Sequence, residues 1–399
     1  MQKAKLALYG GRPVRDSYLA YGGQWIDDHD IEAVIRILKS DWLTTGPAVS
    51  NFEEAMADYV GAKYAVAFSS GTAALHASCF AAGIGENDEV ITTPLTFAAS
   101  ANCILYVGGK PVFADVDSAT CNISPSSIRE SINENTKAII TVDFTGQPIE
   151  YEEVLEIAKE FGLVLISDAA HALGASYKGK MVGSMCDMTI FSFHPVKHIT
   201  TGEGGMVTTD NKDYYEKLLL FRNHGIVRDP DKLENNPGPW FYEIQRLGFN
   251  YRITDFQSAL GLSQLGKLPG FLKKRREYSS RYTEAFDKID GVITPFQNRD
   301  GNSSWHLYIL RLDPAVLSAD RAEIFKALQK ENIGVNVHYI PVYWHPYYQQ
   351  LGYRKGICPN AEEAYGSILT LPLFPKMSIK DVEDVIDGVK KVISYYTVM

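Results

Sequence analysis

The chain has 399 residues, of which 45% are hydrophobic and 22% are charged, so it is long and apolar enough to bury a substantial core. Its 39 Lys and Arg residues are outnumbered by 48 Asp and Glu residues, and the net charge of -9 comes without a dense basic run, which argues against nucleic acid as a partner. No stretch approaches the roughly 18 apolar residues of a membrane span, so we expect a cytoplasmic protein without a membrane segment.

From residue 63 onward, short runs of β-branched residues alternate with segments of helical period, a pattern typical of βαβ units around a mostly parallel sheet. Seven runs are predicted to be its strands: 63–68, 89–93, 111–116, 137–142, 163–167, 188–192 and 204–209. Between them, segments 71–83 and 150–162 repeat apolar residues at intervals of three and four and end at Gly. We therefore expect an α/β sheet on which these two segments pack as crossover helices.

The pattern changes after a charged segment, residues 273–289, which we predict to be a helix between two lobes. Runs 306–312 and 335–339 read as strands, and residues 321–333 and the segment from Ile379 as helices, which together predict a smaller α+β lobe. We expect an N-terminal arm and large domain over residues 1–265 and a small C-terminal domain over residues 266–399. Residues 234–242, "ENNPGPWFY", are predicted to form an exposed loop.

Five widely spaced cysteines form no CxxC pair. Their odd number and spacing predict neither a disulfide framework nor a zinc site, and we expect no metal. Each is interpreted as a small buried hydrophobic residue.

Lys197 lies in "FSFHPVKHITTGEGG", residues 191–205, where Pro195 ends the strand predicted over residues 188–192. It should emerge at the carboxyl edge of the sheet, where ligands bind in open α/β folds. Burial there favours the neutral amine, which is a nucleophile toward carbonyl groups. A surface lysine after a turn is an equally good interpretation of this stretch alone.

Asp168 directly follows the strand predicted over residues 163–167, so it should reach the same edge. A buried acid requires a cationic partner, and the protonated ring nitrogen of pyridoxal phosphate (PLP) would be one beside a Schiff-base lysine. The alternative is a helix N-cap, a common use of Asp at a strand-to-helix junction.

A phosphate cradle is predicted in "SSGTAAL", residues 69–75, where a strand ends and a helix begins. Gly71 and Thr72 are candidate backbone donors at the helix start, with the Ser192 hydroxyl near the same oxygens. A glycine-containing turn alone is weak evidence, because every βα unit needs one. The combination with Asp168 and Lys197 is what favours PLP.

Several stretches together resemble the sugar-nucleotide aminotransferases of the DegT/DnrJ/EryC1/StrS family, and the likeness extends over essentially the whole chain. They include "SDWLTTGP", "SSGTAALH", "TPLTFAASAN", "SDAAHALGA", "FSFHPVKHITTGEGG", "GFNYRITDFQSALGLSQL" and "VNVHYIPVY". The resemblance implies a PLP-dependent transferase of fold type I, related to aspartate aminotransferase, that acts as a homodimer.

The resemblance also implies roles around the cofactor ring. Lys197 would bind PLP covalently and then move the proton between the amino-acid carbon and the cofactor. Asp168 would pair with the pyridine nitrogen, Phe97 would stack on the ring, and His171 would lie beside the ring hydroxyl. The cofactor would alternate with pyridoxamine 5'-phosphate (PMP).

Phosphate and substrate contacts follow from the same resemblance. Gly71, Thr72 and Ser192 would hold the phosphate, and Asn250 would reach across the dimer to the phosphate of the partner subunit. Substrate contacts are carried over to Tyr21, Trp42, Leu43, Thr44, His194, His338 and Tyr339. Tyr21 and Trp42 could equally be core or interface aromatics, and His194 could simply stabilise a loop. Arg222 and Arg252 are candidates for the anionic groups of the substrates.

Within the family, the sequence is most similar to members of the pseudaminic acid pathway. The implied reaction is amination of C4 of a UDP-4-keto-6-deoxy-N-acetylhexosamine with L-glutamate as the donor, in nonulosonate or other surface-glycan biosynthesis. A UDP-4-keto-arabinose aminotransferase is the alternative. A PLP-dependent sugar dehydratase, in which histidine replaces the lysine, is opposed by Lys197, and a non-catalytic regulator would need an appended module.

Overall fold

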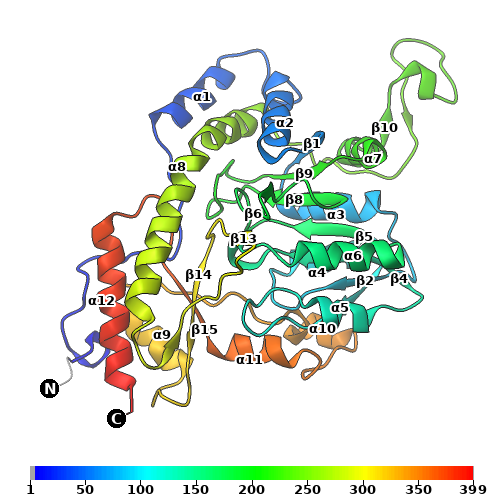
Figure 1. Ribbon diagram of the computed structural model, residues 1–399. Coiled ribbons are helices and arrows are strands. Elements are labelled where there is room, and N and C mark those ends of the chain that lie inside the picture. Colours follow the sequence, from blue (N-terminus) through cyan, green and yellow to red (C-terminus); the bar gives the residue numbers. More distant parts are fainter. Residues whose placement is uncertain (1–4, 399) are drawn as a thin grey trace.

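The computed structural model of the chain describes residues 5–398, and its centre is a seven-stranded sheet in the order β1-β9-β8-β5-β4-β2-β3 (Figure 1). The strands are β1 (Tyr64–Phe68), β2 (Glu89–Thr92), β3 (Lys110–Phe113), β4 (Thr136–Val142), β5 (Val164–Asp168), β8 (Met188–Ser192) and β9 (Gly205–Thr209). Strand β9 runs antiparallel to β1 and β8, and the remaining neighbours pair in parallel. The predicted seven-stranded, mostly parallel sheet is confirmed, and each predicted run overlaps one strand.

Helices cover both faces of this sheet, because its strands are apolar on both sides. One face packs against α3 (Gly71–Ala81), α4 (Ala99–Tyr106) and α7 (Lys212–Arg222). The other packs against α2 (Pro47–Val60), α5 (Pro125–Ser131), α6 (Tyr151–Phe161) and α8 (Asp255–Phe286). Successive residues alternate between the two cores, as Ile139 and Ile140 of β4 do.

The two predicted crossover helices are confirmed as α3 and α6. Ser70 caps α3, because its hydroxyl accepts a hydrogen bond from the Ala73 amide at 3.1 Å. Helix α6 ends at Gly162, whose φ of 65° lies in the left-handed region that favours glycine.

Helix α8 is a single 32-residue helix that contributes to two cores (Figure 1). Leu265, Leu268 and Leu272 pack with the large sheet, whereas Tyr282 and Phe286 pack in the core of the small lobe. The predicted linking helix, residues 273–289, is therefore the C-terminal half of α8. The domain boundary predicted between residues 265 and 266 falls inside this helix, and that division stays a prediction.

The small lobe is built on an antiparallel sheet of β12 (Val292–Ile293), β14 (Tyr308–Leu312) and β15 (Ile368–Leu371). Its helices are α9 (Arg321–Lys330), α10 (Pro346–Gln350), α11 (Pro359–Ser367) and α12 (Ile379–Tyr396). The prediction of a strand over residues 335–339 is wrong, because this segment pairs through an isolated bridge between Asn336 and Thr370. It instead carries His338 and Tyr339 toward the large lobe.

The remaining elements are short or peripheral: α1 (Asp28–Leu38), β6 (Ser176–Tyr177), β7 (Lys180–Met181), β10 (Ile226–Val227), β11 (Glu243–Ile244) and β13 (Gly301–Asn302). The loop predicted over residues 234–242 connects β10 to β11 and projects from the body of the molecule, with Trp240 73% exposed (Figure 1). Within residues 5–398, no helix combines the length and apolar character needed to cross a membrane.

Candidate active site

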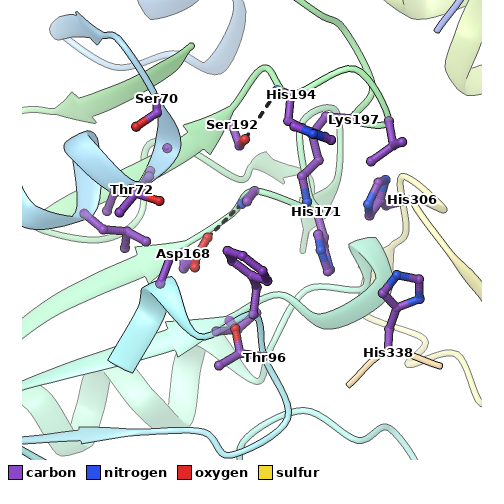
Figure 2. A pocket seen from close by; sticks show the side chains of 18 of the residues that line it. Ser70, Thr72, Thr96, Asp168, His171, Ser192, His194, Lys197, His306 and His338 are labelled. Atoms are coloured by element: carbon purple, nitrogen blue, oxygen red, sulfur yellow. Dashed lines mark hydrogen bonds between the residues drawn. The ribbon is translucent and has the colours of Figure 1, made fainter. Parts of the chain in front are cut away.

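The carboxyl ends of β5 and β8 and the start of α3 surround a cavity of about 430 Å³ (Figure 2). The site residues expected from the sequence that line it are Tyr21, Gly71, Thr72, Phe97, Asp168, His171, Ser192, His194, Lys197, His338 and Tyr339. Residues far apart in the chain are thus brought together at the edge of the sheet where ligands bind in open α/β folds.

Lys197 is placed by the strand that precedes it. Phe191 and Phe193 are fully buried on either side of Ser192, and the Phe193 ring packs against Phe52 at 5.1 Å between centroids. After Pro195 the chain turns, with the Lys197 amide donating to the His194 carbonyl at 2.9 Å. Burial lowers the pKa of the Lys197 amine to about 8, although the charge of Asp168 opposes this shift. About 10% of the amine is therefore neutral at pH 7.

Asp168, the last residue of β5, is buried without an ion pair among the described residues. Ser100 Oγ donates to its Oδ2 at 2.6 Å, and the Ala170 amide donates to its Oδ1 at 3.1 Å. Burial raises the pKa of Asp168, while these two hydrogen bonds and the charge of Lys197 lower it. The alternative of a helix N-cap is wrong, because residues 169–175 form turns and no helix. The carboxylate fits a cationic ring nitrogen in the cavity.

The start of α3 lies against the ends of β8 and β9. A Cβ atom on Gly71 would approach Ser192 Cβ to 3.0 Å and Ser192 Oγ to 3.2 Å. A Cβ atom on Gly205 would lie 2.5 Å from the Ser70 carbonyl oxygen and 2.6 Å from the Gly71 nitrogen. Glycine at both positions permits this close approach, which brings the start of α3 at Gly71 and Thr72 beside Ser192 at the cavity. Such a helix start fits a phosphate group.

The far wall of the cavity combines His171 with two residues of the small lobe. The Tyr339 hydroxyl and His171 Nε2 are 3.2 Å apart, and His338 Nδ1 pairs with Thr370 Oγ1 at 2.8 Å. Burial, and then the charge of Lys197, lower the pKa of His338 to about 4 and that of His171 well below its ordinary value. These rings are therefore neutral near pH 7 and can donate or accept hydrogen bonds without adding charge.

Phe97, His194 and Glu203 are the exposed residues among those that line the cavity. Phe97 is 62% exposed and its ring centroid is 6.3 Å from that of Tyr339. An apolar ring with this much free surface, beside a cavity, can cover a planar ligand. Tyr21 also lines the cavity and packs against His338, with ring centroids 5.3 Å apart.

Some predicted residues lie outside the cavity of their own chain: Trp42, Leu43, Thr44 and Asn250. All are exposed; Thr44 bridges to Thr254 at the start of α8. Their roles toward substrate or toward a partner subunit stay predictions.

The candidate arginines are also outside the cavity. Arg222 pairs with Glu53 at 2.5 Å and donates to the Ala67 carbonyl, and Arg252 donates to Asn223 Oδ1 at 2.6 Å. Arg222 is therefore already satisfied by groups of its own chain.

The sequence interpretation missed Ser70, Ser100 and His306. Ser70 and Ser100 lie within stretches that carried the family resemblance, but a serine next to a predicted helix start does not reveal whether it caps the helix or bonds a carboxylate. His306 was counted only as the first residue of a strand. It lines the cavity from the segment that precedes β14, and no local pattern distinguishes it. Among the described residues, no group of three or more His, Cys, Asp or Glu side chains is arranged to hold a metal ion.

The sequence profile of the DegT/DnrJ/EryC1/StrS aminotransferase family matches residues 24–390. The spore coat polysaccharide biosynthesis protein SpsC of Bacillus subtilis is 44% identical over 381 residues, which are 95% of this chain and 98% of SpsC. The UDP-4-amino-4,6-dideoxy-N-acetyl-β-L-altrosamine transaminase of Campylobacter jejuni is 41% identical over 372 residues, 92% of this chain and 96% of that enzyme.

Two solved structures have the same fold over nearly their whole length. Helicobacter pylori PseC, an aminotransferase of pseudoaminic acid biosynthesis, has a TM-score of 0.89 and 34% identity, with 95% of this chain and 100% of PseC covered. The sugar aminotransferase Spr1654 of Streptococcus pneumoniae in its PLP form has a TM-score of 0.88 and 32% identity, covering 95% of this chain and 99% of Spr1654.

Proposed function

The chain belongs to the DegT/DnrJ/EryC1/StrS aminotransferase family, and on that premise we propose a specific reaction for it. It is a PLP-dependent sugar aminotransferase of fold type I. We propose that it transfers the amino group of L-glutamate to C4 of a UDP-4-keto-6-deoxy-N-acetylhexosamine, in pseudaminic acid-type nonulosonate or other surface-glycan biosynthesis. The identity to the C. jejuni transaminase and to PseC supports this substrate class.

The observation that carries the proposal is the joint presence of Lys197 and Asp168 at one cavity. PLP, when bound, supplies an electron sink that makes the α-carbon of an amino acid acidic. Asp168 would keep the ring nitrogen protonated by pairing with it. Two hydrogen-bond donors fix its carboxylate, and it forms no ion pair among the described residues, so it is free to take this partner. Lys197 Nζ, with a pKa of about 8, would bond to the cofactor and then take and return the substrate proton.

The other cavity residues would position the cofactor and exclude water. The amides of Gly71 and Thr72 and the hydroxyl of Ser192 would hold the phosphate at the positive end of α3. Phe97 would cover the ring, and His171 would contact the ring hydroxyl. The largely apolar walls strengthen each of these electrostatic contacts by keeping solvent away.

A second subunit is part of the proposal, because Lys197 is the only Lys or Arg among the described residues that line the cavity. The carboxylate of glutamate and the pyrophosphate of the UDP-sugar both require cationic partners. Asn250 is exposed and Arg252, two residues on, is half-buried, and both lie outside the cavity of their own chain. We propose a homodimer in which this segment completes the site of the partner.

We place the reaction in the cytoplasm. All five cysteines are free, and four of them are buried. Unpaired cysteines are typical of a reducing compartment.

The test is product analysis with a panel of UDP-4-keto sugars. Incubation with L-glutamate should convert the 4-keto-6-deoxy-N-acetylhexosamine to its amine, seen as the expected mass change, and produce 2-oxoglutarate in equal amount. Preferred amination of UDP-4-keto-arabinose would favour the alternative substrate. A deoxysugar product without an amine would favour the dehydratase and refute the proposal.

Borohydride trapping tests the role of Lys197. Reduction of the protein with PLP should attach the cofactor to the peptide that contains Lys197, and Lys197→Ala should abolish the attachment. Lys212→Ala, at a well-exposed lysine of α7, is the matched control and should leave it unchanged.

A further inference from the structure

Three buried imidazoles form a row that begins at the cavity and runs behind it. The rings of His171 and His306 have centroids 4.4 Å apart, and those of His306 and His198 are 5.5 Å apart. All three residues are buried. They come from three segments: the loop after β5, the segment before β14 and the segment after β8. Figure 2 shows His306 beside His171, on the side away from Ser70 and Thr72.

The backbone around His306 is bound to the large lobe on both sides. The Ser304 amide donates to the Gly146 carbonyl at 3.0 Å, and the Leu307 amide donates to the Thr145 carbonyl at 3.2 Å. Ser304 Oγ donates to the carbonyl of His171 itself at 3.0 Å. The segment that carries His306 is therefore attached directly to the residue whose ring it contacts.

A buried arginine holds the same segment from the other side. Arg275 of α8 is fully buried, and its Nη1 donates to the carbonyl oxygens of Trp305 at 3.1 Å and His306 at 3.0 Å. Trp305 has a φ of 52°, a left-handed conformation that a bulky residue adopts only where the surroundings enforce it. The position of His306 is thus determined by several independent contacts, which is typical of a side chain whose placement matters.

The ring of His171 packs against three other rings. Its centroid is 4.4 Å from that of His306 at an interplanar angle of 40°, 6.0 Å from that of Tyr339 at 22°, and 6.4 Å from that of Phe144 at 39°. His171 Nε2 faces the Tyr339 hydroxyl, whereas its Nδ1 is buried without a hydrogen-bond partner among the described residues. A ring enclosed in this way cannot turn over without displacing His306. The packing therefore selects which nitrogen faces the cavity.

Burial and the basic groups around the row keep these rings neutral. Lys197, His338, Arg275 and Arg276 are the basic neighbours, and Asp168 is the acid that interacts with Lys197. Burial lowers the pKa of His171, His198 and His306 well below the ordinary value, and the basic neighbours lower it further. A neutral imidazole has one donor and one acceptor nitrogen, so its orientation decides what it offers to a ligand.

We propose that His306 is a positioning residue for the transamination: its ring holds His171 in the orientation in which Nε2 faces Tyr339 and the cavity. This rests on the proposed function, in which His171 contacts the ring hydroxyl of the cofactor. His306 thereby ties the placement of the small lobe to the geometry at the cofactor. No charge on His306 is needed for this role, and its ring shape is the property that matters.

Two substitutions separate ring shape from loss of the side chain. His306→Ala removes the ring, whereas His306→Phe keeps an aromatic ring but no nitrogen. We expect His306→Ala to lower kcat about 10- to 100-fold and to leave the KM for the UDP-sugar within about twofold of the wild type. For His306→Phe, both kcat and KM should stay within about threefold of the wild type. His29→Ala, at an exposed histidine of α1, is the control and should match the wild type.

A measurement without cofactor makes the test independent of turnover. The ¹⁵N shifts of labelled histidines in the PLP-free protein report the tautomer of each ring. Without the His306 ring, His171 can turn over and lose the contact between its Nε2 and the Tyr339 hydroxyl, which favours one tautomer. His306→Ala should therefore change the shifts of His171 from one tautomer to a mixture, and His306→Phe should preserve them. Unchanged His171 shifts in His306→Ala would overturn the proposal, as would an equal loss of kcat in the Ala and Phe variants.

Failure of the proposed function gives a different result. A wild-type protein that aminates no UDP-4-keto sugar would refute that function, while the ¹⁵N shifts would still decide whether His306 orients His171. If His306→Ala does not fold, the Phe variant alone decides: preserved His171 shifts and kcat support positioning by ring shape, and their loss refutes it.

Discussion

The Lys197 amine should react with electrophiles at neutral pH much faster than an ordinary lysine does. Its pKa of about 8 compares with an ordinary value of 10.5. At pH 7 these values correspond to a neutral fraction of about 10% for Lys197 and about 0.03% for an exposed lysine, a difference of about 300-fold. The neutral amine is the nucleophile, so the labelling rate should follow that fraction.

Competitive labelling with trace acetic anhydride measures this difference. The PLP-free protein is labelled from pH 6 to 11 and the acetylated peptides are quantified by mass spectrometry, with Lys212 as the exposed internal reference. The Lys197 midpoint is expected at about 8. Asp168→Asn should move this midpoint lower, because the charge of Asp168 raises the pKa of Lys197. A midpoint near 10.5 for Lys197, or an upward shift in Asp168→Asn, would refute the reasoning.

The remaining predictions concern stability and packing. Lys197→Met should raise the free energy of unfolding of the PLP-free protein at pH 7 by at most about 3 kcal/mol, measured by urea unfolding. The reason is that burial of the ammonium is costly below the folded pKa of about 8, so the benefit should fade above pH 8. Burial raises the pKa of Asp143 from 3.8 to about 6, so its carboxylate destabilises the folded protein at pH 7. Asp143→Asn should therefore have a larger free energy of unfolding than the wild type at pH 7, by at most about 3 kcal/mol. This advantage should shrink as the pH falls from 7 to 4, because the wild-type carboxyl group becomes protonated. An advantage that grows on acidification would contradict this account. Gly205→Ala should cost about 1–3 kcal/mol and weaken PLP binding in a fluorescence titration, because its Cβ would lie 2.5 Å from the Ser70 carbonyl oxygen. Gly266→Ala, where a Cβ meets nothing within 4 Å, is the control and should be neutral or stabilising.

The large sheet was predictable because each of its strands can be recognised from its own residues. Parallel strands covered by helices on both faces must be apolar throughout, so runs such as residues 137–142 stand out from their surroundings. The small lobe gave weaker signals. Strand β15 (Ile368–Leu371) is a four-residue run, and the segment 335–339 has the composition of a strand but pairs with β15 through a single bridge. Whether each of these two segments forms a strand depends on its pairing with a distant partner and not on its composition.

The candidate site was predictable as far as it follows strand ends. Lys197, Asp168 and the glycines near α3 could be placed because each adjoins a recognisable strand or helix start. His306 could not, because its contacts with His171 and Arg275 join segments far apart in the sequence. The division predicted between residues 265 and 266 stays a prediction. Helix α8 keeps one regular period while the core it packs against changes, so nothing in its own sequence marks the transition.

Charge balance explains why the cavity combines a lysine with unprotonated histidines. In the proposed function, PLP would bring a phosphate and a protonated ring nitrogen, and Asp168 would pair with that nitrogen. If His171, His306 and His338 were also charged, they would compete with the ring nitrogen for Asp168 and raise the cost of burying Lys197. Burial holds all three rings neutral, so these histidines add no positive charge beside Lys197, which is the only Lys or Arg among the described residues that line the cavity; Glu203 adds an acidic side chain to the lining. The cations that the two anionic substrates require must then approach from outside this cavity, which is where the proposed second subunit would supply them.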